Sequence, residues 1–353
     1  MTPTNPTPVL LVNDRLGGQC QHSGIHQLAR YLGSQGGVRT IETPDTGLRR
    51  WVGKAWSVLR RGPIRNQSQS FTELHALLAL VGRHPTAVHF LVGENHSHFL
   101  AEARSKHRIF ATVHMPPTYQ VPPLPRTGQV DTLILLSSNG KDRYRGAWGA
   151  RRTVVVRHGV DTEFFRPDAR EQTTETSILI VGRFLRDFPL TAATVVALAA
   201  RHRDWRFDFV VTQETWFGPD LATVRVLPGA RWFDRVDDAS LRQRYQRALC
   251  LLSPFLDCTA NNAVVESLAS GLPIVTTDRG GVRDYGAGSV YPLPEAATPE
   301  ALAELCERYA AERGFRDRIG AACRSFALQE LAWPVIAQQH LALYSDQSTP
   351  VEN

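Results

Sequence analysis

The sequence lacks the long apolar segments and the cysteine pairs that define several classes of protein. No stretch of about 18 apolar residues occurs in the 353 residues, so we expect no transmembrane helix. The N-terminus, MTPTNPTPVLLVND, has no basic segment and no small-residue cleavage site, so we expect no signal peptide. The five cysteines form no CxxC pair, and their odd number is typical of reduced thiols in a cytoplasmic protein.

Several signatures of cofactor and nucleophile chemistry are absent too. Neither half of the chain has GxGxxG after its first apolar run, which disfavours a nicotinamide or flavin enzyme. The P-loop pattern GxxxxGK[ST] and the GxSxG nucleophile turn do not occur. Asp-x-Asp is missing, and of the 12 histidines only His96 and His98 are close in sequence. We therefore expect neither a bound metal ion nor a cofactor.

Composition and charge narrow the remaining classes. Apolar residues make up 42% and charged residues 21%, which is typical of globular proteins and excludes disordered and collagenous chains. Residues 1–168 contain 21 Lys and Arg against 11 Asp and Glu, whereas the remainder contains 19 against 23. A basic first half indicates an anionic partner there. Neither zinc-finger spacing nor an aromatic RNA-binding motif is present, so we expect no nucleic acid.

Short apolar runs alternate with helical patterns along the whole chain. The predicted strands are 9–14, 38–42, 87–92, 108–114, 132–138, 153–157, 178–183, 207–212, 224–228, 249–254 and 273–278. Such near-continuous apolar runs are typical of strands buried on both faces. Strands that alternate with helices form right-handed βαβ units, so the sequence predicts an α/β protein with doubly wound parallel sheets.

A polar, aperiodic segment near the middle of the chain predicts a division into two domains. We expect a Rossmann-like domain at 1–165, a linker at 166–176 and a second Rossmann-like domain at 177–330. Residues 331–353 contain a last helix and a tail. Ligands bind beyond the carboxyl ends of the strands in such sheets, so we expect the site in the loops there, where two domains face each other across a cleft.

The strongest local signal is the segment 249–285, LCLLSPFLDCTANNAVVESLASGLPIVTTDRGGVRDY. A buried strand leads into a polar loop, and a helix begins near Asn262 and carries Glu266 in its first or second turn. Gly280 and Gly281 form a second tight loop. Helix N-termini bind anions, but an ordinary βαβ turn has the same pattern, so both interpretations are open at this point.

This segment resembles the donor-binding region of glycosyltransferase family four. The family pattern is a glutamate, seven residues, a second glutamate, a short helix, Gly-x-Pro and a Gly-Gly loop. Glu266 matches the second glutamate, which in the family binds the nucleotide ribose. Cys258 stands where the first glutamate is expected, so Asp257 is a candidate substitute. The resemblance implies that loop residues contribute to donor binding, namely Thr259, Asn262 and Ala263.

The resemblance extends along most of the chain. Residues 154–167, VVVRHGVDTEFFRP, resemble the family's interdomain strand and hinge, and residues 333–344 resemble its last helix. The implied fold is GT-B, in which that helix crosses back to the first domain. Arg183 matches the arginine that follows the first strand of the second domain. Arg186 lies near, but is offset from, the family's lysine. Both cations are expected to stabilise a departing diphosphate, although a surface cation is the alternative for Arg183.

Four residues in the first half complete the predicted donor site. Ser23 and Gly24 resemble the family's glycine loop before the first helix, and Gly18 is the other candidate for close approach to a phosphate or sugar. His114, at the end of a strand, matches a histidine that the family places over the donor sugar. A lone histidine at a strand end also occurs for structural reasons.

A basic segment at residues 49–62, RRWVGKAWSVLRRG, stands out on physical grounds alone. On a helix, Trp51 and Trp56 fall on one arc, whereas Lys54 and Arg60 fall on the other side. Such a helix suits either an anionic membrane surface or a surface helix that packs its tryptophans on the sheet. Both interpretations are open, and the basic balance of this half favours a lipid surface or a lipid-linked acceptor.

The resemblance implies a retaining, metal-independent glycosyltransferase that moves a sugar from a nucleoside diphosphate sugar, most often a UDP-sugar in the family. The implied acceptor is a glycan, a glycolipid or another small molecule bound by the first domain. We expect a cytoplasmic location, with peripheral attachment to the inner face of the membrane as a variant. Two alternatives are a sugar-nucleotide epimerase, for which Glu94 and Asp257 are candidate carboxylates, and a catalytically silent relative.

Overall fold

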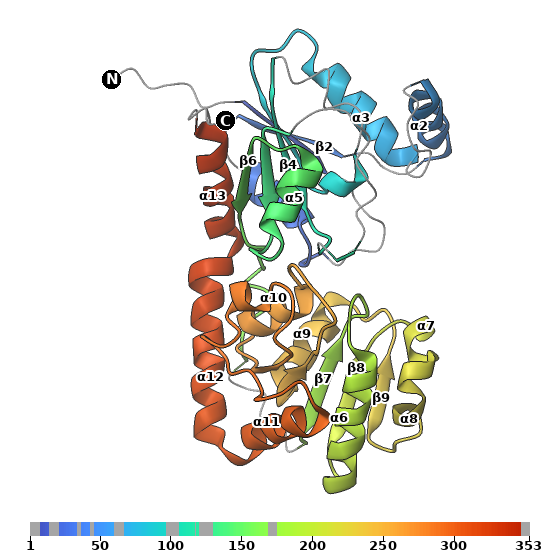
Figure 1. The fold of residues 1–353 in the computed structure, drawn as a ribbon, viewed down its shortest axis with the longest axis vertical. Helices are drawn as coiled ribbons and strands as arrows, with labels where there is room; N and C mark the ends of the chain where they lie inside the picture. Colours follow the sequence, from blue (N-terminus) through green and yellow to red (C-terminus); the bar gives the residue numbers. More distant parts are fainter. Residues whose placement is uncertain are drawn as a thin grey trace. The chain divides into compact units, whose positions relative to one another are not determined.

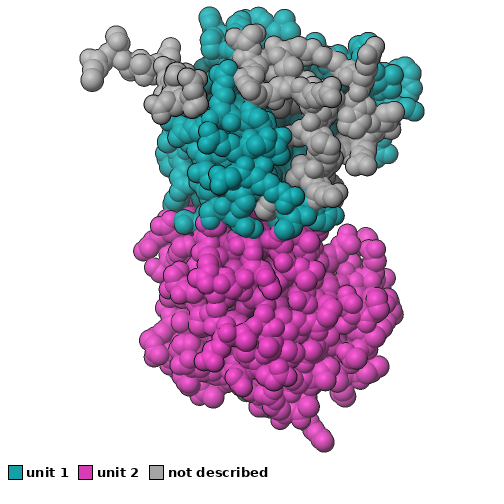
Figure 2. Space-filling view, viewed as in Figure 1, with its two compact units in different colours: residues 1–19, 23–158, 333–353 teal, residues 20–22, 159–332 magenta. Residues whose placement is uncertain are grey.

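The computed structural model describes residues 8–13, 21–33, 37–42, 46–59, 67–96, 106–116, 118–119, 130–168 and 175–346. The chain divides into two compact units, which Figure 2 shows in separate colours. Unit 1 comprises residues 1–19, 23–158 and 333–353, and unit 2 comprises residues 20–22 and 159–332. Each unit contains one parallel sheet with helices packed on it, as Figure 1 shows.

Unit 1 contains a six-stranded parallel sheet in the order β2-β1-β3-β4-β5-β6. The strands are β1 (Val9–Asn13), β2 (Val38–Glu42), β3 (Ala87–Phe90), β4 (Arg108–Val113), β5 (Thr132–Leu135) and β6 (Arg152–Val155). The helices are α1 (His26–Gly33), α2 (Gly47–Leu59), α3 (Gln67–Leu80), α5 (Lys141–Trp148) and α13 (Trp333–Ser345). A short 3-10 turn, η1 (Gly93–Asn95), follows β3.

Unit 2 contains a five-stranded parallel sheet in the order β11-β10-β7-β8-β9. The strands are β7 (Ser177–Val181), β8 (Arg206–Val210), β9 (Ala230–Phe233), β10 (Cys250–Leu252) and β11 (Ile274–Val275). The helices are α6 (Phe188–Arg201), α7 (Gln213–Trp216), α8 (Ala222–Arg225), α9 (Asp238–Arg247), α10 (Asn262–Ala269), α11 (Pro299–Ala311) and α12 (Arg313–Phe326). Single turns complete the unit at η2 (Pro219–Leu221) and η3 (Val282–Tyr285), and a π-helical turn, η4 (Ala327–Leu331), follows α12.

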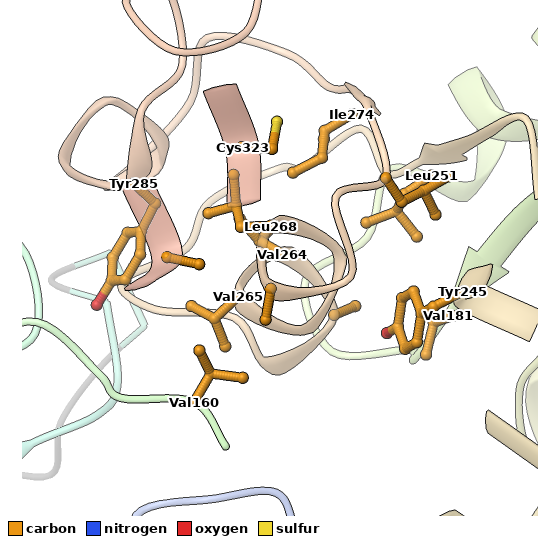
Figure 3. Packing of buried hydrophobic residues seen from close by; sticks show 14 of the residues in the cluster. Val160, Val181, Tyr245, Leu251, Val264, Val265, Leu268, Ile274, Tyr285 and Cys323 are labelled. Atoms are coloured by element: carbon orange, nitrogen blue, oxygen red, sulfur yellow. The ribbon is translucent and has the colours of Figure 1, made fainter. Parts of the chain in front are cut away.

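Alternate strand residues enter different cores, as expected for strands buried on both faces. In β7, Leu179 and Val181 pack into one cluster, whereas Ile178 and Ile180 pack into the cluster on the other face. Figure 3 shows the first of these clusters around α10, which contributes Val264, Val265 and Leu268. The predicted fold class, α/β with two doubly wound parallel sheets, is confirmed.

One predicted strand, 224–228, is wrong. Val224 and Arg225 belong to helix α8, and the strand in this region is β9, which begins at Ala230. Pro228 has no N–H to donate to a sheet, and the ladder with β8 starts only when Phe207 donates its N–H to Gly229 O at 2.9 Å. The short run of β-branched residues was therefore insufficient to distinguish a strand from a helical turn.

The last helix, α13, packs on the sheet of unit 1. Trp333 is fully buried in the cluster that contains Val9 and Leu11 of β1. Near the other end of α13, Tyr344 OH lies 2.6 Å from Nδ1 of the buried His89, and Arg108 donates to the backbone oxygen of Tyr344. Burial lowers the pKa of His89 well below its usual value, so this residue is neutral at physiological pH. The predicted return of the C-terminal helix to the first domain is confirmed.

The division between the units differs from the boundary expected at residue 165. The chain passes into unit 2 between His158 and Gly159. Phe165 is fully buried in the core of unit 2, and Val160 donates its N–H to Leu331 O at 2.8 Å. The segment from 159 to 165 therefore belongs to the second unit through its packing. Part of the expected linker, residues 169–174, lies outside the described residues.

Candidate functional site

The strand order of unit 2 defines where a ligand can bind. From β7 the chain adds β8 and β9 on one side of the sheet, and it then returns to add β10 and β11 on the other side of β7. The strand order therefore reverses between β7 and β10. Loops that leave the carboxyl ends of two such strands diverge and leave a crevice at this switch point. The two loops here are 182–187, after β7, and 253–261, after β10. They are joined by an isolated bridge between Arg186 and Phe255.

Arg186 is the central charged group of this site. Its side chain donates from Nε and Nη2 to Val181 O, at 3.1 and 2.7 Å, and from Nη2 to Asn261 Oδ1 at 2.9 Å. The guanidinium lies over the ring of Phe255, 4.4 Å from its centroid. The residue is only 5% exposed, and its buried Nη1 has no hydrogen-bond partner among the residues that the structure describes.

The charge of Arg186 is not balanced by a carboxylate. Within the described residues it forms no ion pair, and its hydrogen-bond acceptors are a neutral carbonyl and a neutral amide. Burial lowers its pKa to about 10, so it remains a cation at neutral pH. A buried, unpaired cation is costly unless an anionic ligand neutralises it, so the site is suited to an anion.

Arg183, the other predicted cation, lies in a different environment. Its side chain is 60% exposed, and its Nη1 lies 3.4 Å from Oε2 of the exposed Glu214. A pair of this kind in solvent contributes little energy. The family resemblance implied the same role for both arginines, but Arg186 is the one that the fold buries at the switch point.

Helix α10 begins at Asn262, as predicted, and its N-terminus points into the loop cluster. Asn261 is the N-cap, since its Oδ1 accepts the N–H of Ala263 at 3.0 Å. The same oxygen accepts the bond from Arg186, so one amide both caps the helix and orients the guanidinium. Asn262 is exposed and Ala263 is buried. Asn261 was not among the predicted site residues, although its residue type before a helix was a recognisable signal.

Glu266 lies one turn into α10 and is buried. It accepts a hydrogen bond from the hydroxyl of Tyr245 at 2.9 Å. Tyr245, which Figure 3 shows beside α10, comes from α9 and packs edge-on against Phe165 at 5.9 Å. This contact fixes the orientation of the carboxylate. No local pattern in the sequence indicated Tyr245, because α9 is far from α10 in the chain.

The loop after β10 is pressed against the glycine loop. The N–H of Gly281 donates to Cys258 O at 2.7 Å, and Asp257 Oδ1 accepts the N–H of Cys258 at 2.8 Å. Asp257, Cys258 and Thr259 are all buried. Burial raises the pKa of the Cys258 thiol to about 11, so this side chain is neutral where the family has a carboxylate.

In unit 1, His114 follows β4 and is half-buried. Its ring Nε2 lies 2.7 Å from Leu91 O, and its backbone N–H donates to Oε1 of Glu94. The same oxygen accepts the N–H of Met115 at 2.7 Å, so Glu94 holds the loop after β4. Ser23 and Gly24 precede α1, and Gly24 has a φ of +94° that favours glycine. Gly18 lies outside the described residues.

The predicted basic helix is α2, and only a small part of its surface is buried. Gly53 and Ser57 are buried, and the Ser57 hydroxyl lies 2.6 Å from that of Ser70 in α3. Trp56 is half-buried, whereas Trp51 is 70% exposed and Lys54 is exposed. Trp51 therefore does not pack on the sheet, which was the alternative interpretation for this helix. Arg60 lies outside the described residues.

Among the described residues, no helix is long and apolar enough to cross a membrane. In the same part of the chain, no three His, Cys, Asp or Glu side chains are grouped to hold a metal ion.

Two Rossmann-like units, each with one parallel sheet, are the architecture of the GT-B glycosyltransferases. Residues 175–312 match the family described as glycosyl transferases group 1. The matched part contains Arg186 and Glu266, and the family resemblance predicted from the sequence is confirmed.

Individual relatives agree with this class. The chain is 26% identical over 220 residues to the alpha-maltose-1-phosphate synthase of Mycobacterium tuberculosis, which covers 54% of this chain and 56% of that protein. It thus spans about half the length of the curated relatives it matches. Among solved structures it is similar to sucrose-phosphate synthase from Thermosynechococcus elongatus, with a TM-score of 0.70, 18% identity and coverage of 96% and 98% of the two chains. HepE of Anabaena, in complex with UDP and glucose, has a TM-score of 0.68, 12% identity and coverage of 96% and 99%.

Proposed function

We propose that this protein is a retaining, metal-independent glycosyltransferase that moves a sugar from a UDP-sugar to a glycan, glycolipid or other small-molecule acceptor. The observation that supports it best is Arg186, a buried cation with an unpartnered Nη1 and no carboxylate partner within the described residues. A diphosphate supplies the missing charge and the missing acceptor atoms together. The UDP bound to HepE supports the choice of nucleotide.

Each described group at the switch point has a role in this proposal. Arg186 binds the diphosphate and stabilises the charge that develops on it as the glycosidic bond breaks. The positive end of α10 adds to this stabilisation, with Asn262 and Ala263 in its first turn. Glu266, oriented by Tyr245, binds the ribose hydroxyls. Arg183 is exposed and assists at the rim of the site.

The remaining predicted residues complete the proposed mechanism. Asp257 and Thr259 belong to the loop after β10 that we propose binds the donor, and Ser23, Gly24, Gly18 and His114 of the first domain stay predictions for donor binding. The departing diphosphate accepts the proton of the acceptor hydroxyl on the face from which it leaves. No separate base or metal ion is then needed, and the anomeric configuration is retained.

Nucleotide titration tests the donor site directly. We expect UDP to stabilise the protein in the presence of EDTA as well as of magnesium, by about 2.7 kcal/mol at 100 times its dissociation constant. Thermal unfolding with UDP, GDP, ADP and dTDP measures this and compares the bases. Glu266→Gln should weaken UDP binding, whereas Glu214→Gln, at an exposed carboxylate in the same unit, should not. Stabilisation by none of the nucleotides would overturn the proposal.

A catalytically silent relative is the second candidate, and Cys258 is the observation that favours it. The buried, neutral thiol cannot form the charge-assisted bonds to sugar hydroxyls that a carboxylate forms. Transfer or hydrolysis of radiolabelled UDP-sugars separates the two functions. UDP binding without any turnover of UDP-glucose, UDP-galactose or UDP-N-acetylglucosamine would favour the silent relative.

We also propose that α2 places the protein on an anionic membrane surface where a lipid-linked acceptor lies. The helix contains no acidic residue, and Leu48, Trp51 and Leu59 are more than two-thirds exposed beside Lys54. Exposed apolar side chains insert into the membrane interface, and neighbouring cations are attracted to anionic lipid headgroups.

Vesicle sedimentation tests this membrane proposal. Binding to vesicles with about a third anionic lipid should fall at least about fivefold in Trp51→Gln. Val226→Gln, at a side chain of unit 2 that is 80% exposed, is the matched control and should bind as the unchanged protein does. Equal binding by both variants, or equal binding to neutral vesicles, would contradict the proposal.

A further inference from the structure

A hollow in unit 2 lies at the opposite end of its sheet from loops 182–187 and 253–261, which are the proposed donor loops. This groove has a volume of about 710 Å³, and its lining includes the residues that directly precede three strands of the sheet. Thr176 directly precedes β7, Leu249 precedes β10 and Pro273 precedes β11. The groove is therefore at the amino ends of the same strands whose carboxyl ends carry the Arg186 site. Helix α10, eight residues or about 12 Å long, lies between the two regions.

One wall of the groove is a face of α12. Arg313, Arg316, Gly320 and Arg324 follow one another along this face at helical spacing. At Gly320 the helix lies against the turn after α10, where a Cβ would be 2.5 Å from Gly271 O. This close approach sets the depth of the groove, because a larger residue at position 320 would force α12 away.

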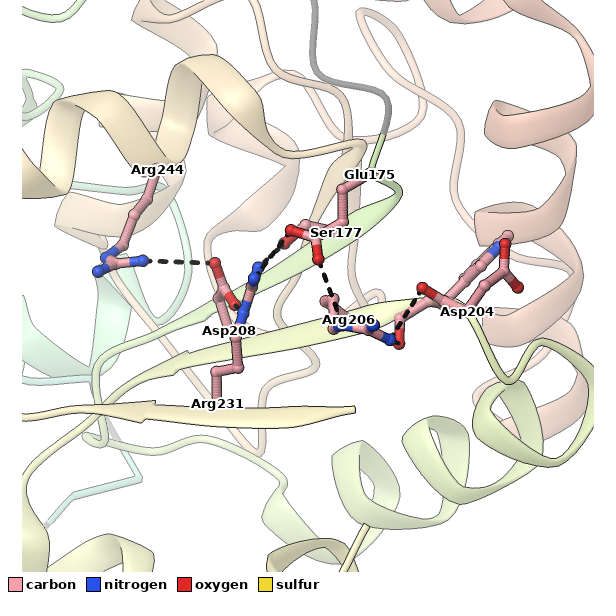
Figure 4. Close-up of polar contacts among 8 residues, drawn as sticks. Glu175, Ser177, Asp204, Arg206, Asp208, Arg231 and Arg244 are labelled. Carbon is pink, nitrogen blue, oxygen red and sulfur yellow. Dashed lines mark hydrogen bonds and ion pairs between the residues drawn. The ribbon is translucent and has the colours of Figure 1, made fainter. Parts of the chain in front are cut away.

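The charge of the groove is positive. Four arginines line it, namely Arg247, Arg313, Arg316 and Arg324, against three acids, namely Asp168, Glu175 and Asp317. Glu175 is already paired with Arg206 and Arg231, which do not line the groove, at 3.2 and 2.8 Å (Figure 4). Asp317 is shared between Arg313 at 3.6 Å and Arg316 at 3.5 Å. The groove is thus lined by one more arginine than acids, and Glu175 is also paired with arginines outside it.

Two groups in the groove have unused hydrogen-bonding capacity. Arg324 donates from Nη1 to the backbone oxygens of Thr162, Phe165 and Ala269, at 2.7 to 3.0 Å, and within the described residues it forms no ion pair. Ser270, which is 4% exposed, has a buried hydroxyl with no hydrogen-bond partner among the described residues. A hydroxyl without a partner and a guanidinium without an ion pair, both lining one groove, are donors of the kind that a phosphate monoester accepts from.

We propose that this groove is a binding site for a phosphorylated small molecule of about the size of a sugar phosphate. The phosphate contacts Arg316, Arg324 and the Ser270 hydroxyl, and Arg313 closes the site at the N-terminal end of α12. The volume is in the range of small-molecule sites, roughly 300 to 1,000 Å³, and exceeds what a free phosphate ion fills. The proposal does not depend on the donor site, which lies at the other end of α10.

Isothermal titration calorimetry with glucose 6-phosphate, at fixed ionic strength, tests the proposal. We expect saturable binding that is at least about tenfold weaker in the double variant Arg313→Gln/Arg316→Gln. Arg318→Gln is the matched control, because Arg318 lies on α12 but does not line the groove. Within the part of the chain that the structure describes, the ion pairs of Arg313 and Arg316 are only the two long ones with Asp317, so the double variant is expected to fold normally.

Two further titrations distinguish the groove from the donor loops and from a site for any free anion. Binding should persist in Arg186→Gln, which removes the donor-site cation and leaves the groove intact. Inorganic phosphate should bind more weakly than glucose 6-phosphate, because it lacks the part of the ligand that fills the groove. No binding at millimolar concentrations, or an equal loss in Arg318→Gln, would overturn the site. Loss only in Arg186→Gln would also overturn it, because the probe would then occupy the donor loops.

Discussion

An Arg186→Gln variant is expected to lose nucleotide binding and at least about 100-fold in kcat/KM, while its stability without nucleotide is unchanged or higher. Both results have one cause. The guanidinium is buried without a carboxylate partner among the described residues, so we expect it to destabilise the empty protein and to be neutralised by the diphosphate of the proposed donor. Glutamine is neutral and retains donors toward Val181 O and Asn261 Oδ1.

The measurement is a pair of titrations, UDP affinity by calorimetry and Tm without nucleotide. Arg183→Gln is the control, because that cation is exposed and already lies near Glu214, so it should change affinity less than about fivefold. A purely structural role for Arg186 predicts the opposite pattern, a lower Tm in the empty protein. Such a drop, together with normal UDP affinity, would contradict the proposed donor site.

A Gly280→Ala variant is expected to destabilise the protein by more than about 2 kcal/mol and to weaken UDP binding as well. Gly280 has a φ of +58°, and a Cβ there would lie 2.3 and 2.4 Å from Cys258 O and N and 2.5 Å from Asp257 Oδ1. These atoms are backbone and a buried carboxylate, so relief requires the two loops to separate. The loop after β10 would then be displaced, and Asp257 and Thr259 of the proposed donor site would move with it. UDP binding should weaken as a result.

Gly82→Ala separates the two contributions to this effect. Gly82 also has a positive φ, +72°, but a Cβ there would meet nothing within 4 Å. Its substitution should cost only about 1 kcal/mol, the effect of backbone conformation alone. Urea unfolding of the three proteins, combined with UDP titration, measures the difference. An equal cost at the two glycines would show that the loop contact carries no energy.

Some of the local structure around these residues could be predicted from the sequence, and some could not. The start of α10 at Asn262 was predictable, because an Asn before an apolar helical run is a local capping signal. The burial of β7 on both faces was also predictable from local sequence, because its continuous apolar run leaves no solvent-facing residue. Where two states share a local pattern, as in 224–228, the sequence did not separate them.

The sequence by itself determined the fold class and the family resemblance, because each depends on residues that are near neighbours in the chain. Only the tertiary structure decided which arginine is buried at the switch point, that Tyr245 orients Glu266, and that Trp51 faces solvent. These facts depend on contacts between segments far apart in the sequence. The groove at the amino ends of β7, β10 and β11 arises in the same way, because strand order and the packing of α12 bring its arginines together.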